Sequence, residues 1–332
     1  MSLPDWARAY ASAPPDGRAQ IFTARIRTTP EDFQVIEELG FEFSGDGEHD
    51  YLWIEKTGTN TEWLSRQLAH FSEVPAKDIG YAGLKDRHAV TRQWFSVPRW
   101  NSPDWAAFAV EGATVLDVQR HSKKLRRGAH KTNAFRIVLR GENLAPYAEE
   151  IEQRIQIIRE QGVPNYFGEQ RFGRGGSNLE LADVWAKGKR LPRHKRSLAI
   201  SSIRSFVFNE SLDVRVRNGT WNILLAGDKA NLDGTGSVFD VEEVDEELVR
   251  RCSEMDIHPA GELVGDGSDT GPEEWLCALG KARVDKGSRS LRLKVDGLEV
   301  QTGDDAVVLS FTLGRGAFAT SVLREIVQTR IT

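Results

Sequence analysis

Apolar residues recur at helical spacing in several segments, and this pattern predicts the helices of the chain. The expected helices cover residues 63–71, 147–158, 201–216, 242–255 and 318–326. The first follows the sequence TNTE at residues 59–62, which resembles a capping box. The second should end at Gly162 and Pro164, because glycine and proline terminate helices.

Other segments have the composition and alternation that predict strands. Residues 134–140 alternate between apolar and polar side chains, as a half-buried strand does. Residues 93–97 and 306–313 are also expected to be strands. Asp86 then lies in the loop between the first helix and the strand at 93–97, and loops on a rigid scaffold commonly carry catalytic groups.

The length of the chain bears on its domain organisation. With 332 residues it is long for a single core, so we expect two domains. The segment up to about Pro15 is rich in alanine and proline and should be a loosely attached arm. Residues 261–272 are acidic and rich in turn-forming residues, which indicates a domain boundary or a flexible loop.

Composition excludes several classes of protein. Hydrophobic residues make up 39% of the chain and charged residues 28%, as in an ordinary soluble protein. No apolar run approaches the roughly 18 residues of a membrane helix, and the N-terminus lacks the features of a signal peptide. Cys252 and Cys277 form neither a C-x-x-C pair nor a disulfide framework, and the histidines show no metal-binding spacing. We therefore expect a cytoplasmic protein with no membrane association and no metal.

The formal net charge of −5 conceals two basic runs. Residues 120–131 and 187–196 contain no acidic residue, and each run alone is as typical of a solvated loop as of a phosphate-binding surface. Between them lies the glycine-rich segment 168–176, which lacks the G-K-[ST] ending of a nucleotide P-loop. Two basic runs flanking such a segment favour RNA. The expected phosphate-binding residues are Lys123, Lys124, Arg126, Arg127, Arg171, Arg174, Lys195 and Arg196.

Residues 80–94 carry the most specific chemistry in the chain. They read GYAGLKDRHAVTRQW and place one carboxylate, that of Asp86, in a turn with several cationic neighbours. Nearby cations favour the ionised form of a carboxylate, which a nucleophile or a general base requires. Alone, such a turn is also typical of a surface loop with solvated ion pairs.

This segment closely resembles the catalytic motif of the TruD family of tRNA pseudouridine synthases, A-G-x-K-D-[KR]-x-x-V-T-x-Q-[WF]. Residues 162–178 resemble the family signature P-N-Y-F-G-x-Q-R-F-G. Shorter matches follow in family order at residues 30–33, 133–135 and 316–325. Because ordered matches extend over nearly the whole chain, the sequence is identified as a member of this family.

The resemblance implies a mixed α/β (α+β) fold. It implies a pseudouridine synthase catalytic domain with a permuted motif order, formed by residues 1–165 and 295–332. It also implies an inserted TruD-specific α/β domain within residues 162–294, with boundaries uncertain by 10–25 residues.

The implied activity is the isomerisation of uridine to pseudouridine at position 13 in the D arm of tRNA, most often of tRNA-Glu. The reaction cuts the N1–C1′ bond, turns the uracil and joins C5 to C1′, so it requires no cofactor and no metal. Asp86 would be the single catalytic aspartate, acting either as a nucleophile at C1′ or as a base on the 2′ proton. We expect a monomer whose partner is tRNA.

The resemblance also implies which residues surround Asp86. A uridine must leave its stack before a carboxylate can reach it. The expected walls of its pocket are Phe33, Phe135 and Phe318, although each alone is more typical of a core residue. Asn133 would read the uracil edge or fix the catalytic loop. The candidates for the counter-charge of Asp86 are Arg324, which is favoured, and Arg27 and Lys85.

Two other classes of function remain open. A non-catalytic tRNA-binding or RNA-folding protein would keep the basic and aromatic residues without needing Asp86. A nucleoside hydrolase or base glycosylase would also use a carboxylate at C1′, but would admit water and release uracil. The intact Lys85-Asp86 motif counts against the first class, and the lack of a second paired carboxylate near Asp86 counts against the second.

Overall fold

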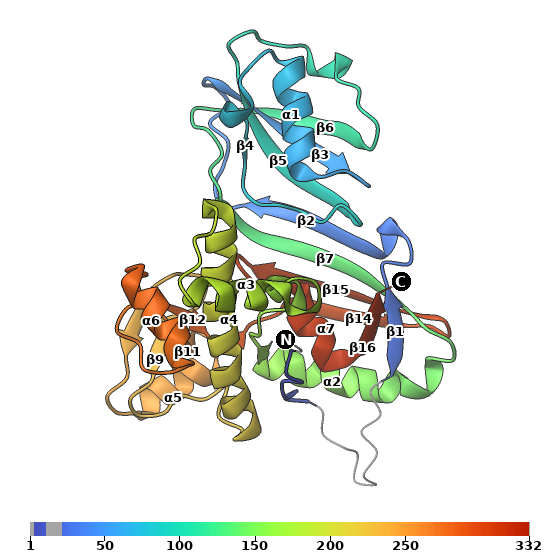
Figure 1. Ribbon diagram of the computed structural model, residues 1–332. Helices are drawn as coiled ribbons and strands as arrows, with labels where there is room; N and C mark the ends of the chain where they lie inside the picture. Colours follow the sequence, from blue (N-terminus) through green and yellow to red (C-terminus); the bar gives the residue numbers. More distant parts are fainter. Residues whose placement is uncertain (1–2, 11–21, 332) are drawn as a thin grey trace. The chain divides into compact units, whose positions relative to one another are not determined.

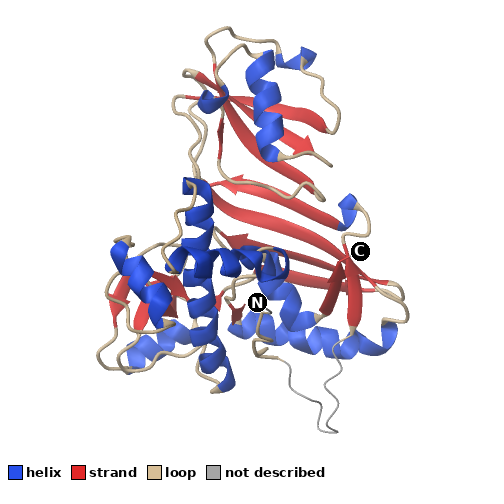
Figure 2. Cartoon of the chain, in the orientation of Figure 1, coloured by secondary structure: helices blue, strands red, loops and turns tan. Residues whose placement is uncertain are grey.

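The computed structural model describes residues 3–10 and 22–331, and these form two compact units. The unit that we call the sheet unit holds residues 22–155, 295–316 and 327–331. The unit that we call the helical unit holds residues 3–10, 156–294 and 317–326. Strands dominate the first unit and helices the second (Figure 2). The division of the chain into a catalytic and an inserted domain is a statement about function, and it stays a prediction.

The sheet unit is built on one large sheet, whose strands follow the order β14-β15-β7-β2-β5-β3-β6 (Figure 1). Strand β1 pairs with β7 and β16, and β4 pairs with β5. The pairings of β2 with β5 and of β1 with β16 are parallel, and the others are antiparallel. The strands are β1 (Thr23–Ile26), β2 (Phe33–Leu39), β3 (His49–Lys56), β4 (Gly80–Tyr81), β5 (Val90–Pro98), β6 (Ala113–His121), β7 (His130–Arg140), β14 (Asp296–Thr302), β15 (Ala306–Gly314) and β16 (Gln328–Ile331).

Helix α1 (Thr61–Phe71) packs on β5 of this sheet, and its buried Leu64 and Leu68 join the core of the strands. The predicted capping box is displaced by one residue. Asn60 is the N-cap, and its side-chain oxygen accepts from the backbone N–H of Glu62 at 2.8 Å. Short 3-10 helices complete the unit: η1 (Pro30–Asp32), η2 (Ala76–Asp78), η3 (Trp105–Ala107) and η4 (Ala145–Tyr147).

The helical unit combines helices with a small sheet of order β10-β9-β11-β12 and a two-stranded pair, β13 with β8. Helix α2 begins in the sheet unit and ends in the helical unit. The helices are α2 (Ala148–Gln161), η5 (Glu169–Phe172), η6 (Arg174–Gly176), α3 (Ser177–Ala186), α4 (Arg193–Arg217), α5 (Glu246–Ser253), α6 (Glu273–Lys281) and α7 (Ala319–Ile326). The strands are β8 (Val163–Pro164), β9 (Lys229–Leu232), β10 (Val238–Asp240), β11 (Ile257–Leu263), β12 (Gly287–Ser290) and β13 (Arg292–Leu293).

The predicted helix ends agree with the structure where the local signal is strong. Helix α2 stops before Gly162, whose φ of +74° is unfavourable for other residues. The position also leaves no room for a side chain, because a Cβ there would lie 2.5 Å from the Leu293 carbonyl oxygen. Helix α4 begins at Arg193 rather than at the predicted Ser201. The prediction missed its first turns because they are polar and carry no apolar stripe.

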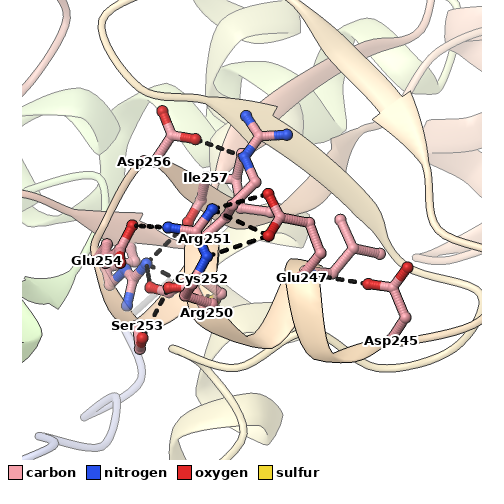
Figure 3. A network of polar contacts seen from close by, with 11 residues as sticks. Asp245, Glu247, Arg250, Arg251, Cys252, Ser253, Glu254, Asp256 and Ile257 are labelled. Atoms are coloured by element: carbon pink, nitrogen blue, oxygen red, sulfur yellow. Dashed lines mark hydrogen bonds and ion pairs between the residues drawn. The ribbon is translucent and has the colours of Figure 1, made fainter.

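Helix α5 is shorter than the predicted 242–255, and polar contacts mark both of its ends (Figure 3). The Asp245 carboxylate accepts from the backbone N–H of Leu248 at 2.8 Å and caps the first turn. At the other end, the buried Arg292 guanidinium donates to the carbonyl oxygens of Cys252 at 2.6 Å and Ile257 at 2.8 Å. These carbonyl groups therefore have a partner where the helix stops.

The N-terminal segment is not a loosely attached arm over the residues that the structure describes. Trp6 and Tyr10 are buried in the helical unit, and Trp6 donates from its indole N–H to Glu210 at 2.6 Å. The Tyr10 hydroxyl donates to the Gly162 carbonyl oxygen at 2.7 Å. The expectation was therefore wrong for residues 3–10, because buried aromatic side chains anchor a segment whatever its alanine content. Residues 11–15 lie outside the described residues.

In the part of the chain that the structure describes, no helix is both long enough and apolar enough to cross a membrane.

Candidate active site

Asp86 lies in the loop between β4 and β5 of the sheet unit, and its carboxylate has two fixed partners. The Arg27 guanidinium forms an ion pair with Oδ2 at 2.8 Å. The backbone N–H of His88 donates to Oδ1 at 2.9 Å. The Asp86 side chain is 32% exposed, so it is oriented by these contacts and still open to a ligand.

Arg27 reaches Asp86 from the end of β1 and also contacts the ring of Phe33. The centre of its guanidinium lies 4.4 Å from the centroid of that ring, within the range of a cation–π contact. The backbone of Arg27 has φ +60°, a value that residues other than glycine rarely adopt. The ion pair and the ring contact hold the residue in this conformation.

Two buried side chains, Thr61 and Gln93, tie the Asp86 loop to the scaffold. The Gln93 amide donates to the Gly83 carbonyl oxygen at 3.2 Å, and the Lys85 backbone N–H donates to the Thr61 hydroxyl at 3.1 Å. Thr61 and Gln93 are themselves joined by a hydrogen bond of 3.0 Å. The loop before Asp86 is therefore held by hydrogen bonds to α1 and β5.

Lys85 does not contact the Asp86 carboxylate but forms an ion pair with Glu37. Its ammonium lies 2.9 Å from Glu37 Oε2 and donates to Asn133 Oδ1 at 2.5 Å. Glu37 is fully buried, and its other oxygen accepts from the backbone N–H of Trp94 at 3.2 Å. This network attaches the Asp86 loop to strands β2, β7 and β5.

A buried lysine, Lys56, also contacts the loop. Its ammonium donates to the backbone carbonyl oxygens of Asp86 at 3.1 Å and Thr59 at 3.0 Å. Burial lowers the pKa of Lys56 to about 8, against the opposing effect of the Asp86 charge. Lys56 thus joins the end of β3 to the residue that carries the carboxylate.

Phe135 lies within a row of aromatic rings on the sheet. It is stacked on Phe311 with a centroid distance of 5.3 Å and meets Phe33 edge to face at 6.2 Å. The strand register explains this row, because Phe135 pairs with Phe311 of β15 and with Val35 of β2. Phe33 is buried, whereas Phe135 is partly exposed.

Phe318 belongs to the helical unit, where it lies among Phe167 and two arginines. The rings of Phe167 and Phe318 are 6.2 Å apart. The Arg289 guanidinium lies 4.1 Å from the Phe167 centroid, and that of Arg171 lies at 5.4 Å. Burial, with a smaller contribution from the charge of Arg171, lowers the pKa of Arg289 to about 9.

Arg324, the favoured candidate for the counter-charge of Asp86, has other partners within the helical unit. Its guanidinium donates to the carbonyl oxygens of Trp6 at 2.7 Å and Ala7 at 3.1 Å, and it lies 4.4 Å from the Tyr166 ring. Among the three candidates, the one that contacts the Asp86 carboxylate is Arg27. The C-terminal helix thus uses its arginine to hold the N-terminal segment.

The predicted phosphate-binding residues of the sheet unit lie in the loop between β6 and β7. Lys123, Lys124 and Arg126 are exposed, and the Arg127 guanidinium lies 3.4 Å from the centroid of Tyr81. This loop is anchored beside Asp86, since the backbone N–H of Gly128 donates to the Ala82 carbonyl oxygen at 2.7 Å. Gly80 permits the close approach, because a Cβ there would lie 2.4 Å from the Leu125 carbonyl oxygen.

The predicted phosphate-binding residues of the helical unit lie on two short stretches. Arg174 is exposed in η6, and Arg171, in η5, is partly buried and donates to the Ser201 hydroxyl at 3.1 Å. Lys195 and Arg196 are exposed in the first turn of α4, which carries no acidic residue. Cations are unfavourable at a helix N-terminus, so helix stability does not account for this charge.

Comparison with known proteins identifies the family. The family described as tRNA pseudouridine synthase D (TruD) matches residues 18–181 and 180–326. The chain belongs to the TruD family. A tRNA pseudouridine synthase D of Methylococcus capsulatus is 45% identical over 92% of this chain and 91% of the relative. That of Nitrosococcus oceani is 44% identical over 97% of this chain and 94% of the relative.

The TruD fold is also found in a solved structure. The crystal structure of a candidate tRNA pseudouridine synthase D from Methanosarcina mazei superposes with a TM-score of 0.73, covers 99% of each chain and is 20% identical. The predicted mixed α/β fold is confirmed by this match.

Sequence reasoning on this TruD-family chain missed Glu37 and Lys56, although a readable signal existed. Strand β2 buries alternate residues through Glu37, and the second half of β3 buries alternate residues up to Lys56. A charged residue at a core position of a strand is rarely tolerated without a partner. The sequence does not say which partner each of the two residues has, because that depends on the fold.

Proposed function

We propose that this chain is a tRNA pseudouridine synthase in which Asp86 is the essential carboxylate. The observation that carries the proposal is the Asp86 carboxylate itself, which Arg27 and the backbone of His88 orient, with the Arg27 guanidinium in turn lying over the ring of Phe33. It supports the proposal because the reaction needs an ionised carboxylate at a fixed position and an aromatic surface for the detached base.

The reaction breaks the N1–C1′ bond of uridine and forms a C5–C1′ bond, and the proton on C5 is lost while N1 gains one. Asp86 either attacks C1′ and displaces the uracil, or removes the 2′ proton to give a glycal-type intermediate. Both routes begin from an ionised carboxylate, and in the structure the Asp86 carboxylate forms an ion pair with the Arg27 guanidinium. Atoms and electrons balance in either route without an oxidant or reductant.

The neighbouring residues have separate roles in this proposal. Phe33 and Phe135 of the sheet unit supply aromatic surface for the extruded uracil, since stacking a base on an aromatic ring is worth about 1–3 kcal/mol. The role of Phe318, which lies in the helical unit, stays a prediction of the family resemblance. Asn133 positions the catalytic loop, and its hydrogen bond to Lys85 supports this role over direct reading of the base. Arg27 is the counter-charge.

We propose uridine 13 in the D arm of tRNA, most often of tRNA-Glu, as the target of a monomeric enzyme acting in the cytoplasm. The exposed cations of both units would bind tRNA phosphates, because clustered cations outweigh a net charge of −5 locally. The residues assigned to phosphates are Lys123, Lys124, Arg126, Arg127, Arg171, Arg174, Lys195 and Arg196.

The proposal is tested by incubating the purified protein with unmodified tRNA transcripts and mapping pseudouridine by chemical adduct stops in reverse transcription. We expect a new stop that reports an adduct at position 13 of the tRNA-Glu transcript, and none with Asp86→Asn. Release of free uracil would indicate a nucleoside hydrolase instead. Tight binding of tRNA with neither product would indicate a non-catalytic RNA-binding protein.

A further inference from the structure

Leu84 is a large apolar residue that the sheet unit holds in solvent, two positions before Asp86. Its side chain is 63% exposed, in a loop whose neighbouring residues are tied to the buried scaffold. A single exposed leucine is ordinary on a protein surface. The position and rigidity of Leu84 therefore matter more than its exposure.

The backbone on each side of Leu84 is held by a hydrogen bond to a buried side chain. The Gly83 carbonyl oxygen accepts from Gln93 at 3.2 Å, and the Lys85 N–H donates to Thr61 at 3.1 Å. Gln93 and Thr61 are buried, and the Thr61 hydroxyl donates a hydrogen bond to the Gln93 side-chain oxygen at 3.0 Å. For Leu84 to turn inward, these hydrogen bonds would have to break, so its exposure is built into the fold.

The side chain that follows Leu84 is also fixed. The Lys85 side chain is only 7% exposed, and its ammonium forms an ion pair with the fully buried Glu37 side chain at 2.9 Å. The loop thus alternates an apolar side chain facing solvent with a charged side chain facing the protein. This is the reverse of the arrangement that hydrophobic burial favours, and a binding partner for the exposed side chain would explain it.

We propose that Leu84 enters the RNA base stack and fills the space that the target uridine leaves. The inference rests on the proposed function, since it requires a nucleotide extruded toward Asp86. Two residues span at most about 7 Å, so Leu84 lies beside any nucleotide bound at Asp86. Leucine is among the apolar residues that proteins insert between bases, and it offers no polar group that would need a partner there.

The consequence is a division of work along the loop. Asp86 acts on the extruded nucleotide, and Leu84 keeps the stack from closing behind it. Loss of the leucine side chain should slow extrusion of the base while leaving the phosphate contacts intact. The exposed leucine should also contribute little to folding, so its removal should not change Tm.

The test combines turnover with a fluorescent reporter of stacking. Single-turnover pseudouridine formation is measured for Leu84→Ala, and we expect the rate to fall about tenfold or more with little change in Kd. Leu84→Met keeps an apolar side chain of similar length and should retain most of the rate. Leu116→Ala removes another exposed leucine of the sheet unit, 47% exposed on β6, and should match the wild type.

The reporter is 2-aminopurine placed beside the target uridine, and its fluorescence rises when stacking is lost. Asp86→Asn should give this rise on binding without turnover, and adding Leu84→Ala should slow or abolish it. A wild-type rate for Leu84→Ala would overturn the proposal. The proposal would also be overturned if Leu84→Ala had a lowered single-turnover rate but a normal fluorescence rise, because Leu84 would then act after extrusion of the base. If the wild type itself forms no pseudouridine, the proposed function fails, a result distinct from either.

Discussion

The two units use the same element, an arginine on a phenylalanine ring, in opposite electrostatic settings. In the sheet unit, Arg27 lies over Phe33 and pairs with the Asp86 carboxylate. In the helical unit, the charge of a second cation, Arg171, adds to burial in lowering the pKa of Arg289 to about 9. One arginine faces an anion of the protein, and the other has a like charge for a neighbour.

The difference indicates a division between chemistry and binding. A cation paired with a carboxylate fixes that carboxylate for a reaction and contributes little potential at a distance. Two neighbouring guanidinium groups repel each other, and an anionic ligand such as a phosphate would relieve that repulsion. We therefore expect substitution of Arg27 or Asp86 in the sheet unit to change the rate, and substitution of Arg171 or Arg289 in the helical unit to change the affinity.

The largest effect should come from Asp86→Asn. The amide keeps the shape of the side chain but can act neither as nucleophile nor as base, so pseudouridine formation should fall below detection while tRNA affinity stays nearly unchanged. Single-turnover assays with a filter-binding control measure both quantities. A residual rate within about tenfold of the wild type would show that another group performs the reaction.

Arg27→Met should follow, with a loss of about 100-fold in single-turnover rate, because the carboxylate loses its charged partner. Arg27→Lys should recover part of that loss by restoring the charge. The matched change in the helical unit, Arg324→Met, removes hydrogen bonds to Trp6 and Ala7 and should instead lower Tm by about 2–4 °C. The comparison fails if Arg324→Met abolishes turnover at unchanged Tm.

Arg171→Met should weaken tRNA binding and reduce the slope of log affinity against log salt by about one unit, as expected for one lost phosphate contact. The rate at saturating enzyme should change little, since the side chain keeps its apolar contact with the rings. Arg250→Met is the control, because Arg250 already pairs with Glu247 and Glu254 on α5. If Arg171→Met and the wild type had equal salt slopes, Arg171 would not contact a phosphate, and its pairing with Arg289 would have only a structural role.

The smallest effect concerns stability and Lys56. Its pKa of about 8 in the folded protein lies below the usual 10.5, so the unfolded chain binds more protons between these values. The contribution of Lys56 to the free energy of unfolding should therefore rise as the pH increases from about 8 to about 10.5. Urea unfolding across this range should show less of that rise for Lys56→Met than for the exposed-site control Lys187→Met. If the free energy of unfolding had the same pH dependence in the two variants, the lowered pKa of Lys56 would be contradicted.

Local signals predicted the elements that surround the site. The apolar stripe and the glycine predicted the end of α2, and the alternation at 134–140 predicted part of β7. The loop position of Asp86 followed from the elements on either side of it. The neighbours of each site residue did not follow, because Arg27, Glu37 and Lys56 meet the loop through strand pairings between distant segments.

The sequence by itself determined the family, the mixed α/β fold and the loop that holds Asp86, since motif order and periodicity are properties of the chain read in line. Only the tertiary structure decided that Arg27 faces Asp86, that Lys85 faces Glu37 and that Arg324 holds the N-terminal segment. The physical reason is that a charged side chain can form an ion pair or hydrogen bond equally well with any of several groups in the chain. The packing of the strands and the burial of neighbouring groups select which partner it reaches.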